Sequence, residues 1–301
     1  METCCILYNP KAGNGRGLNE ARRLDSIWSG KSLDYIDVTT IADIRAYLDS
    51  LPAETTVVLA GGDGTLNHFI NDMGGEAPAR DIYYFAAGSG NDFLRDAERT
   101  RDDPPFLLNP YLQNLPTVTV NGMTRYFLNG IGYGIDGYCC EVGDKQRLKS
   151  DKPVNYTAIA IKGLLFGYHR TLADVCVDGD TKAYRAVWLA PTMKGRFYGG
   201  GMMCARGQNR LDPKGSVSTM VMTGKSKLKT LIVFPSIFKG GHIRHREMVT
   251  IRPGHEVMVR FNRPTALQID GETVLGVTEY SVSTRKSVGA AEKSEAAVVA
   301  E

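Results

Sequence analysis

Three glycine-rich loops in the first hundred residues each follow a short apolar run that predicts a β-strand. The runs are Cys4–Tyr8, Thr55–Ala60 and Asp81–Ala86, with a further strand expected at Tyr35–Val38. Helical patterns are expected over residues 18–28, 41–51, 65–73 and 92–97. Strands that alternate with helices predict a parallel α/β sheet. The loops after such strands meet at one edge of the sheet, where ligands bind.

The first loop, Asn9-Pro10-Lys11-Ala12-Gly13-Asn14-Gly15-Arg16-Gly17, combines glycines with two cations. Glycine permits a positive φ and lets backbone N–H groups approach an anion. The start of a helix adds a partial positive charge. The loop lacks the Gly-Lys-Ser/Thr ending of a Walker A sequence. A phosphate site and a plain strand-to-helix turn therefore both remain open for it.

The second loop, Gly61-Gly62-Asp63-Gly64-Thr65-Leu66-Asn67, surrounds one carboxylate with glycines, and the third is Ala87-Gly88-Ser89-Gly90-Asn91-Asp92-Phe93. Ser89 and the backbone N–H groups of the third loop suit a phosphate. Asp63 and Asp92 are expected to converge on Mg²⁺, which takes one or two carboxylates besides substrate phosphates. The alternatives are turn chemistry for Asp63 and a helix N-terminal carboxylate for Asp92.

From about Asn109 onward, many short strands replace the strand–helix alternation. A hairpin is expected between Val118–Val120 and Tyr126–Ile131, around the Asn121-Gly122 turn. The other expected elements are helices at 156–167 and 227–238 and strands at 173–177, 183–190, 216–222, 248–251, 256–261, 266–269 and 280–283. This pattern predicts a β-sandwich-like second domain. The expected division is an α/β domain at 1–117, a β-sandwich at 118–285 and a flexible tail at 286–301.

Taken together, the three loops resemble the diacylglycerol kinase catalytic family, which includes bacterial lipid kinases and sphingosine kinases. The motifs that carry the resemblance are Asn9-Pro10-x-x-Gly13, Gly61-Gly62-Asp63-Gly64-Thr65-x-Asn67 and Gly88-Ser89-Gly90-Asn91-Asp92-Phe93. It continues through residues 125–132, 199–202, 209–215 and 268–272, and so spans roughly residues 4–283. His68 departs from it, because the family usually has Glu after the Asn.

The resemblance implies an α/β domain like that of NAD kinases and phosphofructokinases, followed by a β-sandwich, with ATP in the cleft. It also implies a nucleotide-binding threonine after the second strand, either Thr39 or Thr40. The implied nucleotide-binding residues are Asn9, Pro10, Lys11, Ala12, Gly13, Thr39, Thr40, Gly61, Gly62, Asp63, Gly64, Thr65, Leu66, Asn67, His68, Ser89 and Asn91.

An acidic motif, Asp270-Gly271-Glu272, follows the short apolar run at 266–269. Phosphoryl transfer to a hydroxyl needs a positioned base and a metal that neutralises charge. The resemblance implies that this pair supplies the proton acceptor, so Glu272, Asp270 and Asp63 are the candidate catalytic residues. Two residues apart on a strand, Asp270 and Glu272 are expected on one face; a hairpin turn is the alternative.

The resemblance also implies a structural Mg²⁺ at Asp212, beside backbone carbonyls. The candidate metal ligands are thus Asp63, Asp92 and Asp212. Many family members have a second Asp where this chain has Pro213, so an ordinary Asp-Pro turn is the alternative.

The charge and composition of the chain limit the classes of partner and the cellular location that can be expected. The net charge of +3 is too small to indicate a nucleic-acid partner. No apolar run reaches 18 residues, the first residues do not read as a signal peptide, and the six cysteines form no C-x-x-C pair. A cytoplasmic protein with reduced thiols is therefore expected.

One basic, apolar segment suggests how such a protein reaches a lipid. The run Leu228–Phe234 is flanked by the side chains Lys225, Lys227, Lys239, His242, Arg244, His245 and Arg246. Apolar bulk flanked by cations is typical of peripheral binding to an anionic membrane. A solvated helix face is the alternative.

The leading functional hypothesis is the ATP- and Mg²⁺-dependent phosphorylation of a lipid hydroxyl, with diacylglycerol converted to phosphatidic acid as first choice. Another lipid (a sphingoid base or phosphatidylglycerol), an NAD kinase-like activity and a catalytically silent nucleotide or lipid sensor are the alternatives. The acyl-chain preference and the oligomeric state, including a homodimer, stay open at this point.

Overall fold

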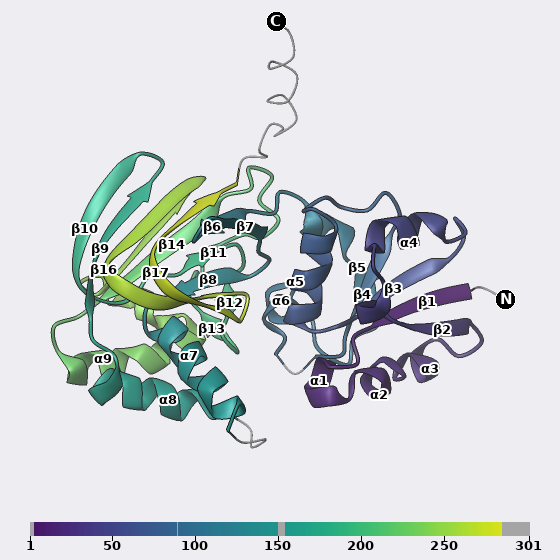
Figure 1. The fold of residues 1–301 in the computed structure, drawn as a ribbon, viewed down its shortest axis with the longest axis horizontal. Coiled ribbons are helices and arrows are strands. Elements are labelled where there is room, and N and C mark those ends of the chain that lie inside the picture. Colours follow the sequence, from purple (N-terminus) through teal and green to yellow (C-terminus); the bar gives the residue numbers. More distant parts are fainter. Residues whose placement is uncertain (1–2, 89, 150–153, 285–301) are drawn as a thin grey trace, which may run out of the picture.

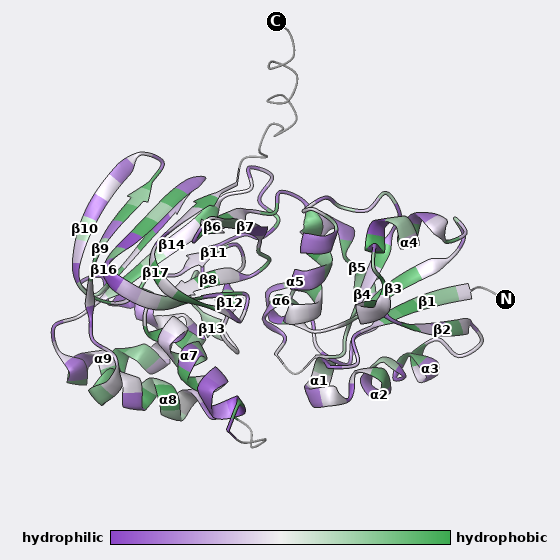
Figure 2. Cartoon of the chain, in the orientation of Figure 1, coloured by the Kyte–Doolittle hydropathy of each residue, from purple (hydrophilic) through white to green (hydrophobic). Residues whose placement is uncertain are grey.

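A computed structural model describes residues 3–88, 90–149 and 154–284, and it contains two large β-sheets side by side (Figure 1). Ser89 and the tail at 286–301 lie outside the described residues. Apolar segments, green in Figure 2, run along strands of both sheets. Each sheet therefore has its own core.

The first sheet has the strand order β2-β1-β3-β4-β5 and is parallel apart from β5. Its strands are β1 (Thr3–Tyr8), β2 (Ser32–Asp37), β3 (Thr56–Gly61), β4 (Ile82–Ala86) and β5 (Phe106–Leu107). The helices of this half are α1 (Ala12–Gly15), α2 (Gly17–Ala21), α3 (Leu24–Ile27), η1 (Val38–Thr40), α4 (Ile44–Ser50), α5 (Asp63–Asp72), α6 (Asp92–Asp96) and η2 (Asn109–Leu112).

Alternate residues of these strands serve two separate cores, as expected for a parallel sheet covered on both faces. Leu7 and Leu59 pack with Leu48 of α4 and Phe69 of α5. Their neighbours on the other face pack with Ala21 of α2 and Leu24 of α3; they are Ile6, Val58 and Ala60. The helix expected over 18–28 is divided into α2 and α3.

The second sheet has the order β7-β6-β17-β16-β8-β11-β14-β10-β9, with β15 beside β14. Its strands are β6 (Thr117–Val120), β7 (Met123–Tyr126), β8 (Gly130–Tyr133), β9 (Thr171–Val177), β10 (Asp180–Leu189), β11 (Thr192–Met193), β14 (Val217–Thr223), β15 (Val249–Gly254), β16 (Glu256–Ile269) and β17 (Glu272–Ser283). Strand β16 pairs with β9 along its first half and with β8 along its second, so the sheet folds back over one apolar core.

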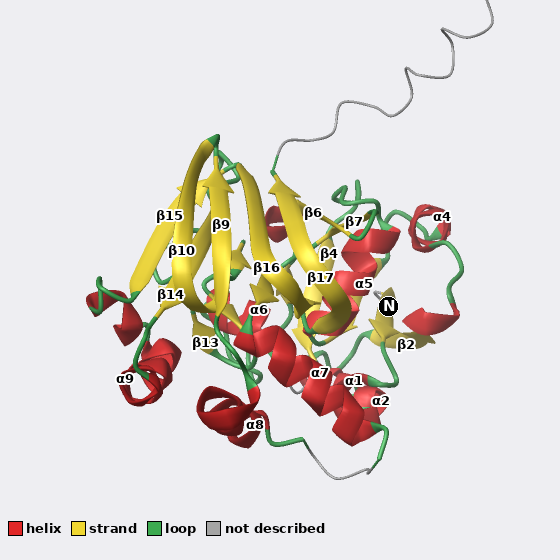
Figure 3. Ribbon diagram, turned by 60° about the vertical axis from the view of Figure 1, so that its left-hand side comes forward, coloured by secondary structure: helices red, strands yellow, loops and turns green. Residues whose placement is uncertain are grey.

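Helices cover the lower edge of this sheet (Figures 1 and 3). They are α7 (Ile135–Arg147), α8 (Tyr156–Lys162), η3 (Gly163–Gly167), α9 (Lys227–Val233), η4 (Phe234–Lys239) and η5 (Gly241–Arg244). A small separate ladder pairs β12 (Phe197–Tyr198) with β13 (Met202–Met203). A second apolar cluster of this half lies between α7–α9 and the sheet.

The hairpin at Asn121-Gly122 is confirmed, but its second strand is β7 and not the expected 126–131. Both turn residues have positive φ, 49° and 78°, as a tight hairpin turn requires. Residues 130–133 instead form β8, which pairs with β11 and β16. The strands expected at 256–261 and 266–269 are one strand, β16, interrupted by register shifts.

Helix α7 was not among the expected elements. Its interior glycines, Gly137 and Gly143, lower helix propensity by about 1 kcal/mol each. The fold explains them, since a Cβ on Gly137 would lie 1.9 Å from the carbonyl oxygen of Ala266. Close packing against β16 therefore requires glycine at position 137. The same glycine lowers the helix propensity of the segment, so the sequence pattern does not predict α7.

The expected fold class, an α/β domain followed by a β-sandwich-like domain, is confirmed. The division at residues 117/118 falls within β6, the first strand of the second sheet in the chain, and as a domain boundary it stays a prediction. Among the described residues, no helix combines the length and the apolar character needed to cross a membrane.

Candidate active site

The second and third glycine loops touch backbone to backbone at the carboxyl edge of the first sheet. A Cβ on Gly88 would lie 2.4 Å from the Cα of Gly62, so neither position has room for a side chain. The first loop joins them, because Asn9 Nδ2 donates to Thr65 Oγ1 at 3.1 Å. The three loops therefore form one surface, as the sequence predicts.

Asp63 is half-buried and holds the start of α6. Its Oδ2 accepts the N–H of Asp92 at 2.9 Å, and its Oδ1 accepts the N–H of Phe93 at 3.0 Å. Burial, with the charge of Asp92 second, raises the pKa of Asp63 to about 7. Asp63 thus ties the second loop to the third, a role that the motif alone does not reveal.

Asp92 is buried and reaches across to the second domain. Its Oδ2 accepts the N–H of Gly200 at 2.8 Å, within the Gly199-Gly200-Gly201 turn. Burial raises the pKa of Asp92, against the lowering effect of the Gly200 N–H and of Arg95. Its Oδ1 is buried without a hydrogen bond in the described chain and lies 3.6 Å from Arg95 Nη1.

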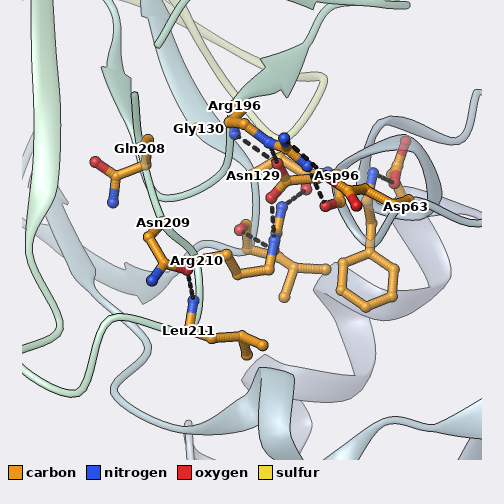
Figure 4. Close-up of polar contacts among 12 residues, drawn as sticks. Asp63, Asp96, Asn129, Gly130, Arg196, Gln208, Asn209, Arg210 and Leu211 are labelled. Atoms are coloured by element: carbon orange, nitrogen blue, oxygen red, sulfur yellow. Dashed lines mark hydrogen bonds and ion pairs between the residues drawn. The ribbon is translucent and has the colours of Figure 1, made fainter. Parts of the chain in front are cut away.

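An ion-pair cluster behind these loops joins the two domains (Figure 4). Asp96 of α6 forms two ion pairs: its Oδ1 lies 2.8 Å from Arg196 Nε, and its Oδ2 lies 2.5 Å from Arg210 Nε. Burial opposes ionisation of Asp96, but Arg210 and Arg196 outweigh it and hold its pKa below the usual value. Arg210 also donates to the carbonyl of Leu128 and to Asn129 Oδ1, both at 2.7 Å, which fixes the connection into β8.

Asp270 lies in the turn between β16 and β17, where it and Gly271 have φ of 47° and 96°. Its carboxylate accepts four hydrogen bonds. The donors are the backbone N–H groups of Leu128 (2.6 Å), Asn129 (2.8 Å) and Gly130 (2.9 Å) and the side chain of Asn67 (2.8 Å). This carboxylate is fully occupied as an anchor.

Glu272 is the more accessible carboxylate of the acidic motif, with 41% of its side chain exposed. Arg125 Nη1 lies 2.5 Å from Glu272 Oε2, and His68 Nε2 lies 3.6 Å from Oε1. Arg125 Nη2 also donates to Asn67 Oδ1 at 2.6 Å. Asn67 therefore bridges the anchor Asp270 and the arginine that orients Glu272.

The expectation that Asp270 and Glu272 share one face of a strand is wrong. The positive φ values at 270 and 271 make a hairpin turn, in which Ile269 pairs with Glu272. The two carboxylates still enter one network, through Asn67 and Arg125. Their proximity comes from the turn and α5, not from strand alternation.

Two family models match this chain. One, described as "YegS C-terminal NAD kinase beta sandwich-like domain", matches residues 129–285, and the other, "Diacylglycerol kinase catalytic domain", matches residues 3–120. The chain belongs to the diacylglycerol kinase catalytic-domain family.

Known relatives of this kinase cover most of its length. A "Diacylglycerol kinase" of Mycobacterium tuberculosis (strain CDC 1551 / Oshkosh) is 23% identical over 82% of this chain and 81% of its own. The solved structure of a diacylglycerol kinase from Bacillus anthracis str. Sterne has a TM-score of 0.56 at 13% identity and covers 94% of both chains. At this level of identity, the structural similarity shows only that the two proteins share a fold.

Other predicted site residues of the kinase lie outside this network. The hydroxyls of Thr39 and Thr40 bond to the side chain and the carbonyl of Asp37. Asp212 accepts the N–H of Lys214 at 3.1 Å and the hydroxyl of Ser216 at 2.7 Å, the pattern of an Asp-Pro turn. Its role as a metal ligand stays a prediction.

The nucleotide role of the loop residues also stays a prediction. Lys11 donates its backbone N–H to Asn9 Oδ1 at 2.9 Å, and Asn91 Nδ2 donates to the carbonyl of Gly88 at 3.2 Å. Gly64 and His68 are exposed. The predicted Ser89 contact falls on a residue outside the described ranges.

The carboxylate oxygens between the loops are of the kind that Mg²⁺ prefers. Three or more potential ligand side chains do not cluster anywhere in residues 3–88, 90–149 and 154–284. Asp63 and Asp92 are nonetheless close enough for the second charge to raise the pKa of the first, and Asp92 Oδ1 is buried without a hydrogen bond in those ranges. A cation with few carboxylate ligands and several phosphate or water ligands suits this arrangement.

Sequence reasoning missed the arginines of the site. Arg125 and Asn129 lie in the stretch 125–132 that carries the resemblance. The sequence therefore marks both residues, but it does not indicate their roles. Arg210 likewise lies in the stretch 209–215, whereas Asp96 and Arg196 carry no motif. Asp96 lies 100 positions from Arg196 and 114 from Arg210.

Proposed function

We propose that this protein is an ATP-dependent lipid kinase, which transfers the γ-phosphoryl group of ATP to a lipid hydroxyl, with diacylglycerol as the preferred substrate. The network Asp270–Asn67–Arg125–Glu272 is the observation that carries the proposal. It leaves one half-exposed carboxylate beside α5, the helix that begins at the second glycine loop. A base next to a phosphate-binding loop is what phosphoryl transfer to a hydroxyl requires.

In the proposed reaction the lipid hydroxyl oxygen attacks the γ-phosphorus of ATP. Its proton passes to Oε1 of Glu272, while the bond between the γ-phosphorus and the β–γ bridging oxygen breaks and ADP leaves. Arg125 binds the other oxygen of Glu272, which leaves Oε1, 3.6 Å from His68 Nε2, to accept the proton. Asp270 takes no part in proton transfer, because four donors already bind its carboxylate.

The glycine loops supply the remaining groups. Gly62 and Gly88 bring backbone close to the nucleotide phosphates without side chains in between. Asp63 and Asp92 are the residues that would hold Mg²⁺, which supplies neutralisation of the phosphate charge when bound. Each of these two carboxylates also fixes backbone of the neighbouring loop, so the phosphate surface is organised before the ligand arrives.

The names of relatives support the substrate class. The Mycobacterium tuberculosis relative is named a diacylglycerol kinase, and its match covers 82% of this chain. A sphingoid base and phosphatidylglycerol are the next lipid candidates, followed by NAD. The presence of a base, its orienting arginine and the loop carboxylates favours an active kinase over a silent sensor.

The deciding experiment measures transfer of radiolabelled γ-phosphate to each candidate in mixed micelles. We expect labelled phosphatidic acid from diacylglycerol, at least tenfold above the label in the other acceptors. A Glu272→Gln enzyme should lose this activity, and the matched surface variant Glu76→Gln should keep it. Preferred labelling of another lipid would correct the substrate; labelling of NAD alone, or of nothing, would refute a lipid kinase.

A further inference from the structure

Two helical segments of the second domain lie side by side along its lower edge (Figures 1 and 3). They are α8 with η3 and α9 with η4. Lys227 Nζ of α9 donates to the carbonyl of Leu165 in η3 at 2.7 Å. Segments that are more than sixty positions apart in the chain therefore present one surface.

This surface carries large apolar side chains that point away from the core. Phe166 is 78% exposed, Ile232 71% and Leu228 69%. Leu228 and Ile232 are four residues apart, hence on one side of α9, whereas Thr230 and Val233 are buried on the other side. With Ile161 and Phe238, these residues form what we call the apolar face.

Cations surround the apolar face. Residues 154–170 and 225–247 together contain eight Lys or Arg and a single Glu, whereas the whole chain has a net charge of only +3. Figure 2 shows green and purple segments alternating along α8 and α9. Lys229 pairs with Glu247 at 2.9 Å. In the described chain no ion pair involves the other exposed cations Lys162, Lys225, Lys239, Arg244 and Arg246.

We infer that the apolar face inserts into the headgroup region of an anionic bilayer, with the surrounding cations on lipid phosphates. A protein partner fits less well, because Lys is depleted in protein interfaces relative to the rest of the protein surface. Long basic side chains that flank an apolar strip are instead typical of interfacial helices. The occupant we assign is the membrane.

The magnitudes favour reversible attachment. Full burial of a Leu, Ile or Phe side chain contributes about 1.5–3 kcal/mol, and a headgroup-level insertion realises part of this. Each cation near an anionic surface adds about 1 kcal/mol, and salt screens this share. Binding should therefore need both parts, and it should weaken as ionic strength rises.

This inference rests on the proposed function in one respect: a lipid kinase must reach a membrane to find its substrate. Vesicle binding is therefore measured without ATP, so that the result does not depend on kinase activity. The full chain is sedimented with vesicles of phosphatidylcholine alone or with about one-third phosphatidylglycerol. We expect at least tenfold tighter binding to the anionic vesicles. The triple variant Phe166→Ser/Leu228→Ser/Ile232→Ser should lose at least tenfold in affinity, at an unchanged melting temperature.

A charge variant and a matched control complete the design. Lys225→Glu/Lys239→Glu/Arg246→Glu should abolish the preference for anionic vesicles. The control Leu172→Ser/Lys182→Glu removes an exposed leucine and an exposed cation from β9 and β10, and it should bind like the wild type. Wild-type binding by the triple variant would overturn the inference.

Two further outcomes separate this inference from its neighbours. If the triple variant changes the sedimentation of the free protein from dimer to monomer and leaves vesicle binding intact, the face is a contact between copies and the inference fails. If the wild type binds vesicles as expected but phosphorylates no lipid, the docking surface stands and the proposed function fails. On a monomeric short-chain lipid, the triple variant should keep the wild-type kcat.

Discussion

At the scale of single residues, the two carboxylates of the acidic motif have different environments. Asp270 is surrounded by four donors, whereas Glu272 has one strong partner and a half-exposed side chain. The sequence predicts that one of the two is the proton acceptor, with only a slight preference for Glu272. The hydrogen bonds, which reach from residue 270 to residues 67 and 128–130, distinguish the anchor Asp270 from the proposed base Glu272.

We expect Glu272→Gln to lower kcat by about 10²–10⁴, the usual contribution of general-base catalysis, with the KM for ATP within about twofold. Asp270→Asn should act differently. It leaves backbone N–H groups without an acceptor and should reduce the free energy of unfolding by about 2–4 kcal/mol. Steady-state kinetics and urea unfolding of both variants test this. A stable, inactive Asp270→Asn with an active Glu272→Gln would reverse the assignment.

Lys194 is a buried cation whose Nζ has no hydrogen bond to the described residues. Burial, with Arg210 second, lowers the pKa of Lys194 to about 8. Below pH 8 the folded state carries a buried charge. Between pH 8 and the unfolded value of 10.5, the folded state releases the proton and the unfolded state keeps it, so stability rises with pH.

Lys194→Met should therefore raise the free energy of unfolding at pH 7 by roughly 1–3 kcal/mol. This advantage over the wild type should shrink as the pH rises from 8 to 10. Urea unfolding at pH 7 and pH 9.5 measures it, with the exposed Lys182→Met as control. An advantage that does not change with pH would contradict the assignment of the lowered pKa.

At the scale of elements, strands and loops were easier to predict than helices. The parallel strands of the first domain follow apolar runs with glycine loops behind them, and the Asn121-Gly122 turn has one favoured geometry. Helix α7 escaped prediction because its Gly137 serves a contact with β16 that no local pattern encodes. The same holds for Asp270. Its positive φ belongs to a turn, and the alternating pattern of a strand does not indicate where such a turn begins.

The contact between the second and third loops gives a prediction at this scale. Gly88→Ala places a Cβ 2.4 Å from the Cα of Gly62, so the two loops must separate. We expect a loss of roughly 2 kcal/mol or more in unfolding free energy and an increased KM for ATP. Gly207→Ala is the matched control, because a Cβ there meets nothing within 4 Å. Equal stability of the two variants would contradict the close contact.

At the scale of the whole molecule, a buried ion-pair cluster holds the domains together. Asp96 comes from the first domain, and Arg196 and Arg210 come from the second. Loss of one partner of a buried ion pair typically costs about 3–5 kcal/mol, since the other charge stays buried. Of its members only Arg210 lies in a stretch that carries the family resemblance, and Asp96 is 100 positions from Arg196 and 114 from Arg210.

Asp96→Asn should therefore uncouple the domains. We expect one calorimetric transition for the wild type and two for this variant, with the lower one at least several degrees below the wild-type melting temperature. Glu98→Gln is the control, because Glu98 also pairs with Arg196, at 3.1 Å, but its side chain is 76% exposed. A single, unshifted transition in Asp96→Asn would show that the cluster does not couple the domains.

The hydrogen bond from Asn67 to Asp270 makes the geometry of the candidate active site depend on how the two domains are placed. Asn67 belongs to α5 of the first domain, and Asp270 belongs to the β16–β17 turn of the second. Any hinge motion that separates α5 from this turn breaks that bond and the bond from Arg125 Nη2 to Asn67 Oδ1, whereas the ion pair between Arg125 and Glu272 lies within the second domain. The arginine that orients the proposed base is therefore itself fully held only while the two domains are in contact.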